Sequence, residues 1–503
     1  MLVGKEYKNQ RMIHMNLLKD PFISTTVGKV SLKDILTTDK DYQLQYFFDE
    51  TQLAMLQMLA SLTTVVLKPT ISELKSYLAH GLTAKQYDQA LSNIETKWFE
   101  DDCFMQSKPA PTAKQFSAAI CNLVSGIESS STGNASGLFS DMSNVDLICP
   151  DCFHTLNYNL HMNIKGDCFG SSGATGIRGG GSLSTLIAKN TLKETILVNT
   201  IAVDYFYEKN QLNAEADNCF MWETPLQGDV YSASKIGLER GLFALAYHIK
   251  FDVQERACIC DVCGSQSNQT VTHFERAKYT GSYGSTKKGR DAGAGWWLHP
   301  YTPVNIKEDG IYAVCAHDQN WQSWQQLSAF IIGKETKKAT LSAAYIVSQF
   351  LKISDNEPVN LLVGGNITSQ ASITGRVYDL YSMPSSLAKN NRQLSLVVDA
   401  GLEQKERLSV AFNKMFGVGY DKNFIGGIKE QAMQCFAANA QQIIQQILLD
   451  VDRKEAAQLR KDAVTSLNYE AKAIFKSVQR KYQHDLPLFK ALVKGEYILY
   501  QKS

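Results

Sequence analysis

Apolar residues recur every three or four positions through the last quarter of the chain, which is the spacing of one face of an α-helix. Two stretches, residues 433–447 and 459–478, carry the pattern without interruption, so each is predicted to form a long amphipathic helix. The apolar positions are Met433, Phe436, Ala440, Ile443, Ile444 and Ile447 in the first stretch, and Leu459, Ala463, Leu467, Ala471, Ile474 and Val478 in the second.

Two further helices are expected over residues 394–416 and 486–500. Four amphipathic helices joined by short connections typically pack as an up-and-down bundle. The turn-forming cluster Ser-Met-Pro-Ser-Ser at residues 382–386 separates this helical part from the chain before it. The sequence therefore predicts a carboxyl-terminal four-helix bundle over residues 387–503.

The pattern before that cluster is mixed. Short runs typical of strands lie at residues 194–203, 310–315 and 359–363, between helical segments and glycine-rich loops. A mixture of this kind predicts a large α+β domain over residues 15–381. Residues 53–67 are the most apolar stretch, but polar side chains interrupt it. We therefore expect a buried helix there and no membrane span.

Composition and charge narrow the class of protein. The length of 503 residues exceeds what one hydrophobic core usually supports, which agrees with more than one domain. The net charge of +1 argues against a free-standing, non-specific nucleic-acid binder, but it allows a subunit with local basic loops. No export signal is recognisable, so a cytoplasmic protein is expected. Residues 1–14 resemble a tag or an upstream start before Met15.

The cysteines are the first candidate chemistry. Eleven cysteines are too few for a disulfide scaffold in a chain of this length, and a cytoplasmic protein meets reducing conditions. Two CxxC pairs each place two thiolates on one tight turn, and together they supply the ligands of a tetrahedral zinc site. A structural zinc ion is therefore predicted, with the ligands Cys149, Cys152, Cys260 and Cys263.

Other readings of these cysteines stay open. A single CxxC is also typical of a redox pair, and Cys258 could compete with Cys260 as a ligand. A catalytic zinc ion needs an open coordination position and a nearby general base, and four thiolates leave neither. The predicted site is therefore structural.

Two loops are suited to close backbone or phosphate contact. Residues 166–181 contain seven glycines in sixteen positions, which lets the backbone approach a ligand and present N–H groups to anions. They lack the order of a nucleotide-binding phosphate loop. The loop from Lys278 to Arg290 is flexible in composition and strongly basic, which suits nucleic-acid phosphates. An ordinary solvated loop is the alternative for both.

Motifs typical of enzymes are missing from the sequence. There is no HExxH, no GxSxG, no Walker pair and no kinase set, and no carboxylate cluster marks a two-metal nuclease. Carboxylates can converge from distant positions, so a divergent metal-dependent nuclease remains an alternative. The sequence favours a protein without catalytic activity.

Several short motifs together resemble the large subunit of the type I-E CRISPR Cascade complex, often called CasA. The resemblance runs in order from Met15 to the carboxyl terminus, and the shared order and spacing carry it. The motifs are MNLLKDPFI from Met15, FMQ from Phe104, the two CxxC pairs, GxRGG from Gly176, RGLF from Arg240, the pair His299 and Pro300, and GGNITSQAS from Gly364.

The resemblance implies a fold and a function. Members of this family have a large α+β domain followed by a four-helix bundle, and they cut nothing. They recognise the protospacer-adjacent motif in double-stranded target DNA, mainly from the minor groove, and wedge a glutamine into the duplex. The implied partners are target DNA, the guide RNA, the other Cascade subunits and the helicase–nuclease. Sequence specificity would then reside in guide pairing.

The resemblance also assigns roles by position. Gln370 matches the wedge, with Ser369 and Ala371 flanking it at the minor groove. Lys278 resembles the lysine that reaches into the groove. The matching glycine loop offers Gly166, Phe169, Gly170 and Gly173, and the further candidates for target-DNA contact are Phe139, Lys287, Lys288 and Arg290.

Three departures from the family pattern affect which protospacer-adjacent motif this chain is expected to prefer. Ser369 stands where the family often has asparagine, the glycine loop is longer, and the basic residues 287–290 are additional. They leave the sequence of the preferred motif open. They do not change the expected recognition from the minor groove, where the base pairs present a degenerate pattern of donors and acceptors. A scaffold subunit without DNA contact is the other alternative.

Overall fold

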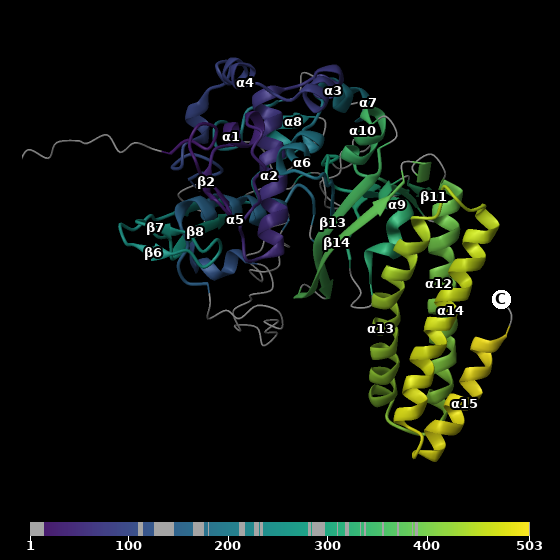
Figure 1. Cartoon of the computed structure of the whole chain (residues 1–503). Coiled ribbons are helices and arrows are strands. Elements are labelled where there is room, and N and C mark those ends of the chain that lie inside the picture. The colour runs from purple at the N-terminus through teal and green to yellow at the C-terminus, as the bar shows by residue number, and fades with distance from the viewer. Residues whose placement is uncertain are drawn as a thin grey trace, which may run out of the picture.

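The computed structural model shows a mixed helical and sheet architecture, which agrees with the predicted fold class, and four long helices follow it (Figure 1). The buried apolar side chains of both parts form one connected core. The described residues are 15–108, 114–124, 145–163, 176–179, 181–210, 217–225, 231, 235–279, 283, 297–308, 310–316, 321–331, 333–335, 339–354, 357–369, 372–384, 386–387 and 391–501.

Two buried helices form the centre of the amino-terminal part, α2 (Asp49–Leu67) and α5 (Pro150–Met162). Two polar side chains inside α2 are satisfied locally, since the hydroxyls of Thr63 and Thr64 donate to carbonyls one turn earlier at 2.7 and 2.8 Å. The prediction of a buried helix over residues 53–67 is confirmed.

Shorter helices complete the amino-terminal part. They are α1 (Leu32–Thr37), α3 (Ile71–His80), α4 (Ala84–Leu91), α6 (Leu192–Asn199), α7 (Val203–Asn210), α8 (Leu238–Leu242), α9 (Leu327–Ile331) and α10 (Tyr345–Ile353), with the 3₁₀ turns η1 (Thr96–Phe99), η2 (Ile120–Leu123) and η6 (Ser323–Gln326). A further 3₁₀ turn, η7 (Lys414–Gly417), belongs to the carboxyl-terminal part.

The described strands form separate small antiparallel sheets. Their orders are β1–β2, β3–β8–β5, β6–β7, β10–β9–β12–β11 and β14–β13–β4. The strands are β1 (Ile23–Thr25), β2 (Gly28–Val30), β3 (Phe116–Ala119), β4 (Ser184–Ile187), β5 (Tyr247–Phe251), β6 (Cys258–Ile259), β7 (Gln266–Ser267), β8 (His273–Lys278), β9 (Val304–Lys307), β10 (Gly310–Ala313), β11 (Lys334–Glu335), β12 (Thr340–Ser342), β13 (Val359–Ser369) and β14 (Ser372–Met383).

The long hairpin of β13 and β14 is the most extended element of this part. The two strands pair from Val359 with Met383 to Ser369 with Ser372, and one register shift, a β-bulge, falls between Ile367 and Thr368. At its base β13 also pairs with β4, which makes it the central strand of three. Strands at residues 310–315 and 359–363 were predicted, and both are confirmed.

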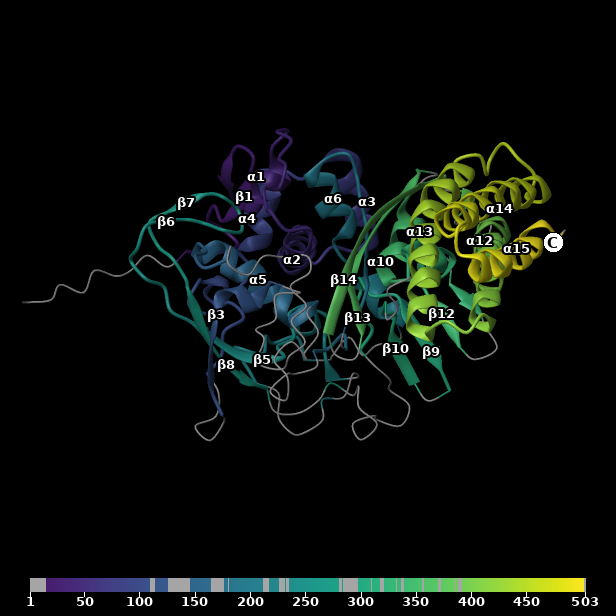
Figure 2. The same cartoon turned by 90° about the horizontal axis from the view of Figure 1, so that it is seen from below.

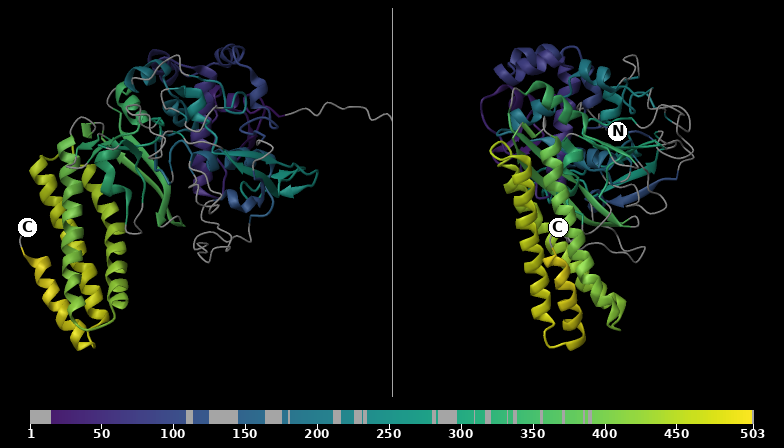
Figure 3. Two further views of the ribbon diagram at one scale, coloured as in Figure 1. Left: turned by 180° about the vertical axis from the view of Figure 1, so that it is seen from behind. Right: turned by 90° about the vertical axis from the view of Figure 1, so that its right-hand side faces the viewer.

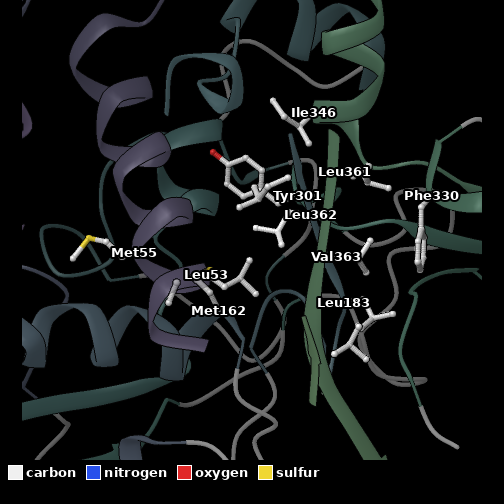
Figure 4. Close-up of a cluster of buried hydrophobic side chains, with 14 of the residues drawn as sticks. Leu53, Met55, Met162, Leu183, Tyr301, Phe330, Ile346, Leu361, Leu362 and Val363 are labelled. Carbon is white, nitrogen blue, oxygen red and sulfur yellow. The ribbon is translucent and has the colours of Figure 1, made fainter. Parts of the chain in front are cut away.

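The hairpin packs closely against α2. A Cβ atom added to Gly364 would overlap the side chain of Leu53, so only glycine allows this approach. Leu362 lies on the side of α2 and Tyr301, whereas Leu361 and Val363 lie on the side of Phe330 (Figure 4). Alternate residues of β13 therefore enter two parts of the core, and both faces of this strand are buried.

The other side of the hairpin meets the carboxyl-terminal helices, so the hairpin stands between α2 and α13 (Lys422–Leu448) (Figure 2). The Asp379 carboxylate on β14 accepts a hydrogen bond from Gln441 Nε2 on α13 at 3.0 Å. Nearby, the Trp324 indole N–H donates to the Ala437 carbonyl at 2.9 Å. Polar contacts thus join the hairpin and its neighbours to the helical part.

Four helices make up the carboxyl-terminal part and lie alongside one another (Figures 1 and 3). They are α12 (Asn391–Asn413), α13, α14 (Ala456–Lys481) and α15 (Leu486–Tyr500). Every predicted apolar position of residues 433–447 and 459–478 is buried or packs against the core. The four predicted helices are therefore confirmed as helices.

One predicted strand is wrong. Residues 194–203 belong mainly to α6, and α7 begins at the last of them. Thr191 and Glu194 form a reciprocal capping box that starts α6, a local signal that outweighs the β-branched residues after it. Residues 195–199 are all buried, so the continuous apolar run reflects burial of a short helix on all sides.

Among the described helices, none is by itself long and apolar enough to cross a bilayer. The pair α2 and α3 passes that test together, but the two helices are bent by 113° at their junction. Fifteen of the nineteen α2 residues are buried in the protein, which is the burial expected of a core helix.

Replacing Gly495 on α15 by alanine should lower the free energy of unfolding by about 1–3 kcal/mol, the usual cost of overpacking. A Cβ atom there would overlap the Ala411 carbonyl oxygen of α12, and backbone cannot move aside like a side chain. Urea unfolding measures the change. The matched control is Gly427→Ala on α13, which has open space around it and should gain about 0.5–1 kcal/mol from helix propensity.

Candidate metal centre and functional loops

The four cysteines of the two CxxC pairs converge in one buried cluster. Their sulfur atoms all lie within 4.8 Å of one another, and the Sγ atoms of Cys149 and Cys263 are 4.0 Å apart. A tetrahedral zinc ion with Zn–S bonds of about 2.3 Å separates its sulfur ligands by about 3.8 Å. The cluster could therefore hold a metal ion with four thiolate ligands.

The first CxxC pair lies at the start of α5. Cys149 is the N-cap residue, Pro150 follows it inside the first turn, where its missing N–H has no helical partner to lose, and Cys152 completes that turn. Both sulfur atoms are thus near the positive end of a helix dipole. This position favours the thiolate form that a metal ion requires.

The second CxxC pair lies on a tight turn between β6 and β7. Gly264 directly follows it and donates its N–H to the Cys260 carbonyl at 2.8 Å. This glycine has a φ of +73°, in the left-handed region, and a Cβ atom there would also approach the Phe47 ring. The glycine after the second CxxC is therefore needed for the turn that presents the sulfur atoms.

Backbone contacts join the two turns independently of any metal. The Asp261 carboxylate accepts hydrogen bonds from the backbone N–H groups of Asp146 and Leu147 at 2.9 and 2.8 Å. Its own N–H donates to the Leu147 carbonyl at 2.9 Å. Ile148 and Val271 also form a bridge between the segments. A metal ion would therefore reinforce a contact that the backbone already makes.

The thiols of the cluster compete for protons. Hydrogen bonding to Cys149 and the other two cysteines, followed by burial, raises the pKa of Cys152 well above its usual value. The pKa of Cys263 is lowered because its sulfur accepts hydrogen bonds from the other three. Four thiolates so close together repel one another, and a bound cation removes that repulsion. The donor set is thus chemically suited to a metal ion.

An ion pair lies beside the cluster, between Lys29 on β2 and Asp151 within the first CxxC. Burial by itself would lower the pKa of the Lys29 ammonium, but Asp151 and then Cys149 raise it above its usual value. The ammonium thus offsets negative charge next to the sulfur atoms. Sequence reasoning missed this pair, because an isolated lysine in a short strand carries no signal.

The predicted wedge residues occupy the connection of the long hairpin. β13 ends at Ser369, β14 begins at Ser372, and these two residues face each other in the register. Gln370 and Ala371 form the connection between them and lie outside the described residues. The structure therefore describes the strands on both sides of the predicted wedge.

The predicted groove lysine is on a different sheet. Lys278 is the last residue of β8, faces Tyr247 of β5 in the register and is exposed. It therefore extends one end of the β3–β8–β5 sheet, whereas the hairpin belongs to the β14–β13–β4 sheet.

The remaining predicted DNA-contact residues lie outside the described part of the chain. They are the glycine-loop residues Gly166, Phe169, Gly170 and Gly173, and the further candidates Phe139, Lys287, Lys288 and Arg290. The described chain ends before this loop at Asn163, after α5, and resumes within the glycine-rich segment at Gly176.

Nearly the whole chain matches one known family. Residues 16–474 match the family described as CRISPR-associated protein Cse1, a range that includes both CxxC pairs and the long hairpin. The chain belongs to the Cse1 family. Cse1 is the large subunit of the type I-E Cascade surveillance complex, so the resemblance inferred from the motifs is confirmed.

Solved Cse1 structures share the fold over almost their full length. Thermobifida fusca Cse1 is 13% identical with a TM-score of 0.67, covering 96% of this chain and 97% of that chain. Thermus thermophilus CasA is 14% identical with a TM-score of 0.66, covering 96% and 99%. A chain of a CRISPR RNA-guided surveillance complex is 15% identical with a TM-score of 0.65, covering 97% and 100%.

The arginine of the GxRGG motif lies inside this Cse1 chain. Arg178 is only 2% exposed, and all five N–H groups of its guanidinium donate hydrogen bonds within the protein. An arginine among glycines in a sequence usually indicates an exposed anion-binding loop, so sequence reasoning missed this internal role. The spacing of the motif gives no sign of it.

Replacing Cys149 by serine should abolish metal binding at the cysteine cluster and lower the melting temperature of the metal-loaded protein. The serine hydroxyl does not supply a thiolate, and a structural metal ion contributes several kcal/mol to folding. Elemental analysis of the purified protein and thermal unfolding measure the two effects.

The matched control is Cys435→Ser, because Cys435 is exposed on α13. It should keep the metal content and the melting temperature of the wild type. Equal metal content in the Cys149 and Cys435 variants would show that the cluster is not the metal site.

Proposed function

We propose that this chain is the motif-reading, non-catalytic large subunit of its surveillance complex. In this proposal it recognises the protospacer-adjacent motif in double-stranded DNA from the minor groove and wedges the duplex open, so that guide RNA can pair. The observation that carries the proposal is the long hairpin whose strand β13 is buried on both faces and whose connection bears Gln370.

The hairpin is physically suited to this task. A wedge must separate stacked bases, which costs a few kcal/mol per step, so the element that carries it must not bend. β13 is held by β14 along its whole length and by β4 at its base, and Gly364 lets α2 pack directly against it. A rigid stem of this kind supports a wedge at its connection.

Lys278 and the loop that follows β8 are proposed to supply phosphate and groove contacts. The lysine is exposed at the last position of its strand. A basic residue at a strand end can reach a nearby phosphate or groove edge without deformation of the sheet. The family resemblance of the glycine-rich segment extends the same role to its backbone N–H groups.

The metal in this proposal is a structural zinc ion held by Cys149, Cys152, Cys260 and Cys263. These four buried cysteines would supply all four ligands, which would leave the ion no open position for water and no role in hydrolysis. Incubation of the purified protein with duplex DNA and Mg²⁺ should therefore give no cleavage. Cleavage that requires the protein would instead favour the nuclease alternative.

The proposed partners follow from family membership. They are target DNA, the guide RNA, the other Cascade subunits and the helicase–nuclease recruited after pairing, in the cytoplasm. We assign motif reading to the α+β domain of residues 15–381. The helices of residues 387–503 are proposed to act as a four-helix bundle that docks on neighbouring subunits.

Replacing Gln370 by alanine should slow strand opening by roughly tenfold while changing initial duplex binding little, since a wedge acts after the groove is occupied. Stopped-flow fluorescence of a base analogue next to the motif measures opening, and gel shifts measure binding. The matched control is Gln89→Ala, an exposed glutamine on α4. Equal losses in opening and binding would exclude the wedge role.

Replacing Lys278 by alanine should weaken binding to motif-bearing duplex and reduce the slope of log affinity against log salt concentration by about one. The cause is the loss of one cation contact with DNA. Fluorescence anisotropy of the assembled complex at several salt concentrations measures both quantities. Lys75→Ala on α3 is the control, because this lysine is also exposed. Unchanged affinity in the Lys278 variant contradicts the assignment.

A further inference from the structure

Arg178 is the centre of a buried polar cluster next to the hairpin. Its Nε donates to the Thr302 hydroxyl at 2.7 Å. One Nη atom donates to the Met162 carbonyl at 3.1 Å and to the Asn163 side-chain oxygen, and the other donates to the Leu183 carbonyl at 3.0 Å and to the Ser184 hydroxyl at 2.8 Å. All five bonds end on neutral oxygens.

Four of the side chains in this cluster close a ring of hydrogen bonds. Gln57 of α2 donates to the Ser184 hydroxyl at 2.7 Å, and Asn163 donates to the Gln57 side-chain oxygen at 2.8 Å. Arg178 closes the ring, because it donates to both Asn163 and Ser184. These side chains are at most 9% exposed, so water does not compete for the bonds.

The ring joins the two elements that the proposed function requires to act together. Asn163 is the last described residue before the glycine-rich segment of residues 166–181, and Arg178 lies in the part of that segment, residues 176–179, where the described chain resumes. Ser184 pairs directly with Gly364 of β13, in the stem of the hairpin. Arg178 therefore connects both ends of the glycine-rich segment to the strand beside the hairpin.

The geometry of this connection is narrowly defined. At Gly176 a Cβ atom would overlap the His161 carbonyl oxygen, so the returning chain lies directly against the end of α5. A planar guanidinium directs five N–H groups in fixed directions, whereas an ammonium offers three on a flexible stem. Burial lowers the pKa of Arg178 to about 10, yet the group stays charged near neutral pH. Leaving any of its donors unpaired would be costly.

We propose that Arg178 is a positioning residue for motif discrimination, because it fixes the glycine-rich segment relative to the β13–β14 hairpin. It touches no DNA and acts through Asn163 and Ser184. This inference rests on the proposed function, since it assumes that both elements read the same duplex. A displacement between them would weaken contacts to the correct motif more than contacts to any duplex.

Arg178→Lys tests the inference, since it keeps the charge but cannot make all five bonds. The measured quantity is the ratio of affinities for motif-bearing and motif-free duplex, determined on the assembled complex well below its melting temperature. We expect this ratio to fall roughly tenfold, equivalent to about 1.4 kcal/mol. Affinity for motif-free duplex should stay unchanged.

Two controls separate positioning from general stability. Arg240→Lys alters another buried arginine, which lies on α8 and donates hydrogen bonds to the Asp217 carboxylate and the Thr224 carbonyl. This variant should have a lower melting temperature but an unchanged affinity ratio. Thr302→Val removes one acceptor of Arg178 that is outside the ring, and should also preserve the ratio.

Ser184→Ala gives a milder break of the same ring and should reduce the ratio even if the Arg178 variant does not fold. If folded Arg178→Lys or Ser184→Ala keeps the wild-type ratio of affinities for motif-bearing and motif-free duplex, the positioning role is wrong. The proposed function would not be affected by that result. Loss of discrimination in the Arg240 variant as well would also overturn it, since the effect would then be general. A wild type without motif preference would overturn the proposed function, and this inference with it.

Discussion

The approach of α2 to β13 is the contact on which the rest of the structure depends. Gly364 allows Leu53 to lie directly over the strand backbone, and from this contact the core extends in both directions. β4, which carries Ser184 of the buried polar ring, pairs with the same strand, and α13 packs on the other strand of the hairpin. The hairpin of β13 and β14 thereby lies in contact with both the amino-terminal part and the carboxyl-terminal helices.

Features that depend on local sequence could be predicted. The apolar periodicity at residues 433–447 and 459–478 predicts one buried helix face in each stretch. The CxxC spacing predicts a turn that presents two thiols. Order and spacing of short motifs were sufficient to indicate the family. Such signals survive in one sequence because each is contained within a few residues or one helix face.

Features that depend on distant partners could not be predicted. The apolar run at residues 194–203 is compatible with a buried strand or a buried helix, and only the capping box beginning at Thr191 favours the helix. Nothing in the chain indicates that Lys29 pairs with Asp151, or that Arg178 is enclosed by neutral oxygens. Pairing of β4 with β13 likewise joins segments far apart in sequence.

The wide separation of the two CxxC turns has a consequence for how the chain reaches its native state. Closing a loop of about 100 residues costs more entropy than closing a short one, and contacts of this range form slowly. All four cysteines exist only after the chain has been synthesised past residue 263. The two turns must then come together before they can bind one ion. A metal ion held by all four cysteines would therefore be captured late, once two segments far apart in the sequence have come together.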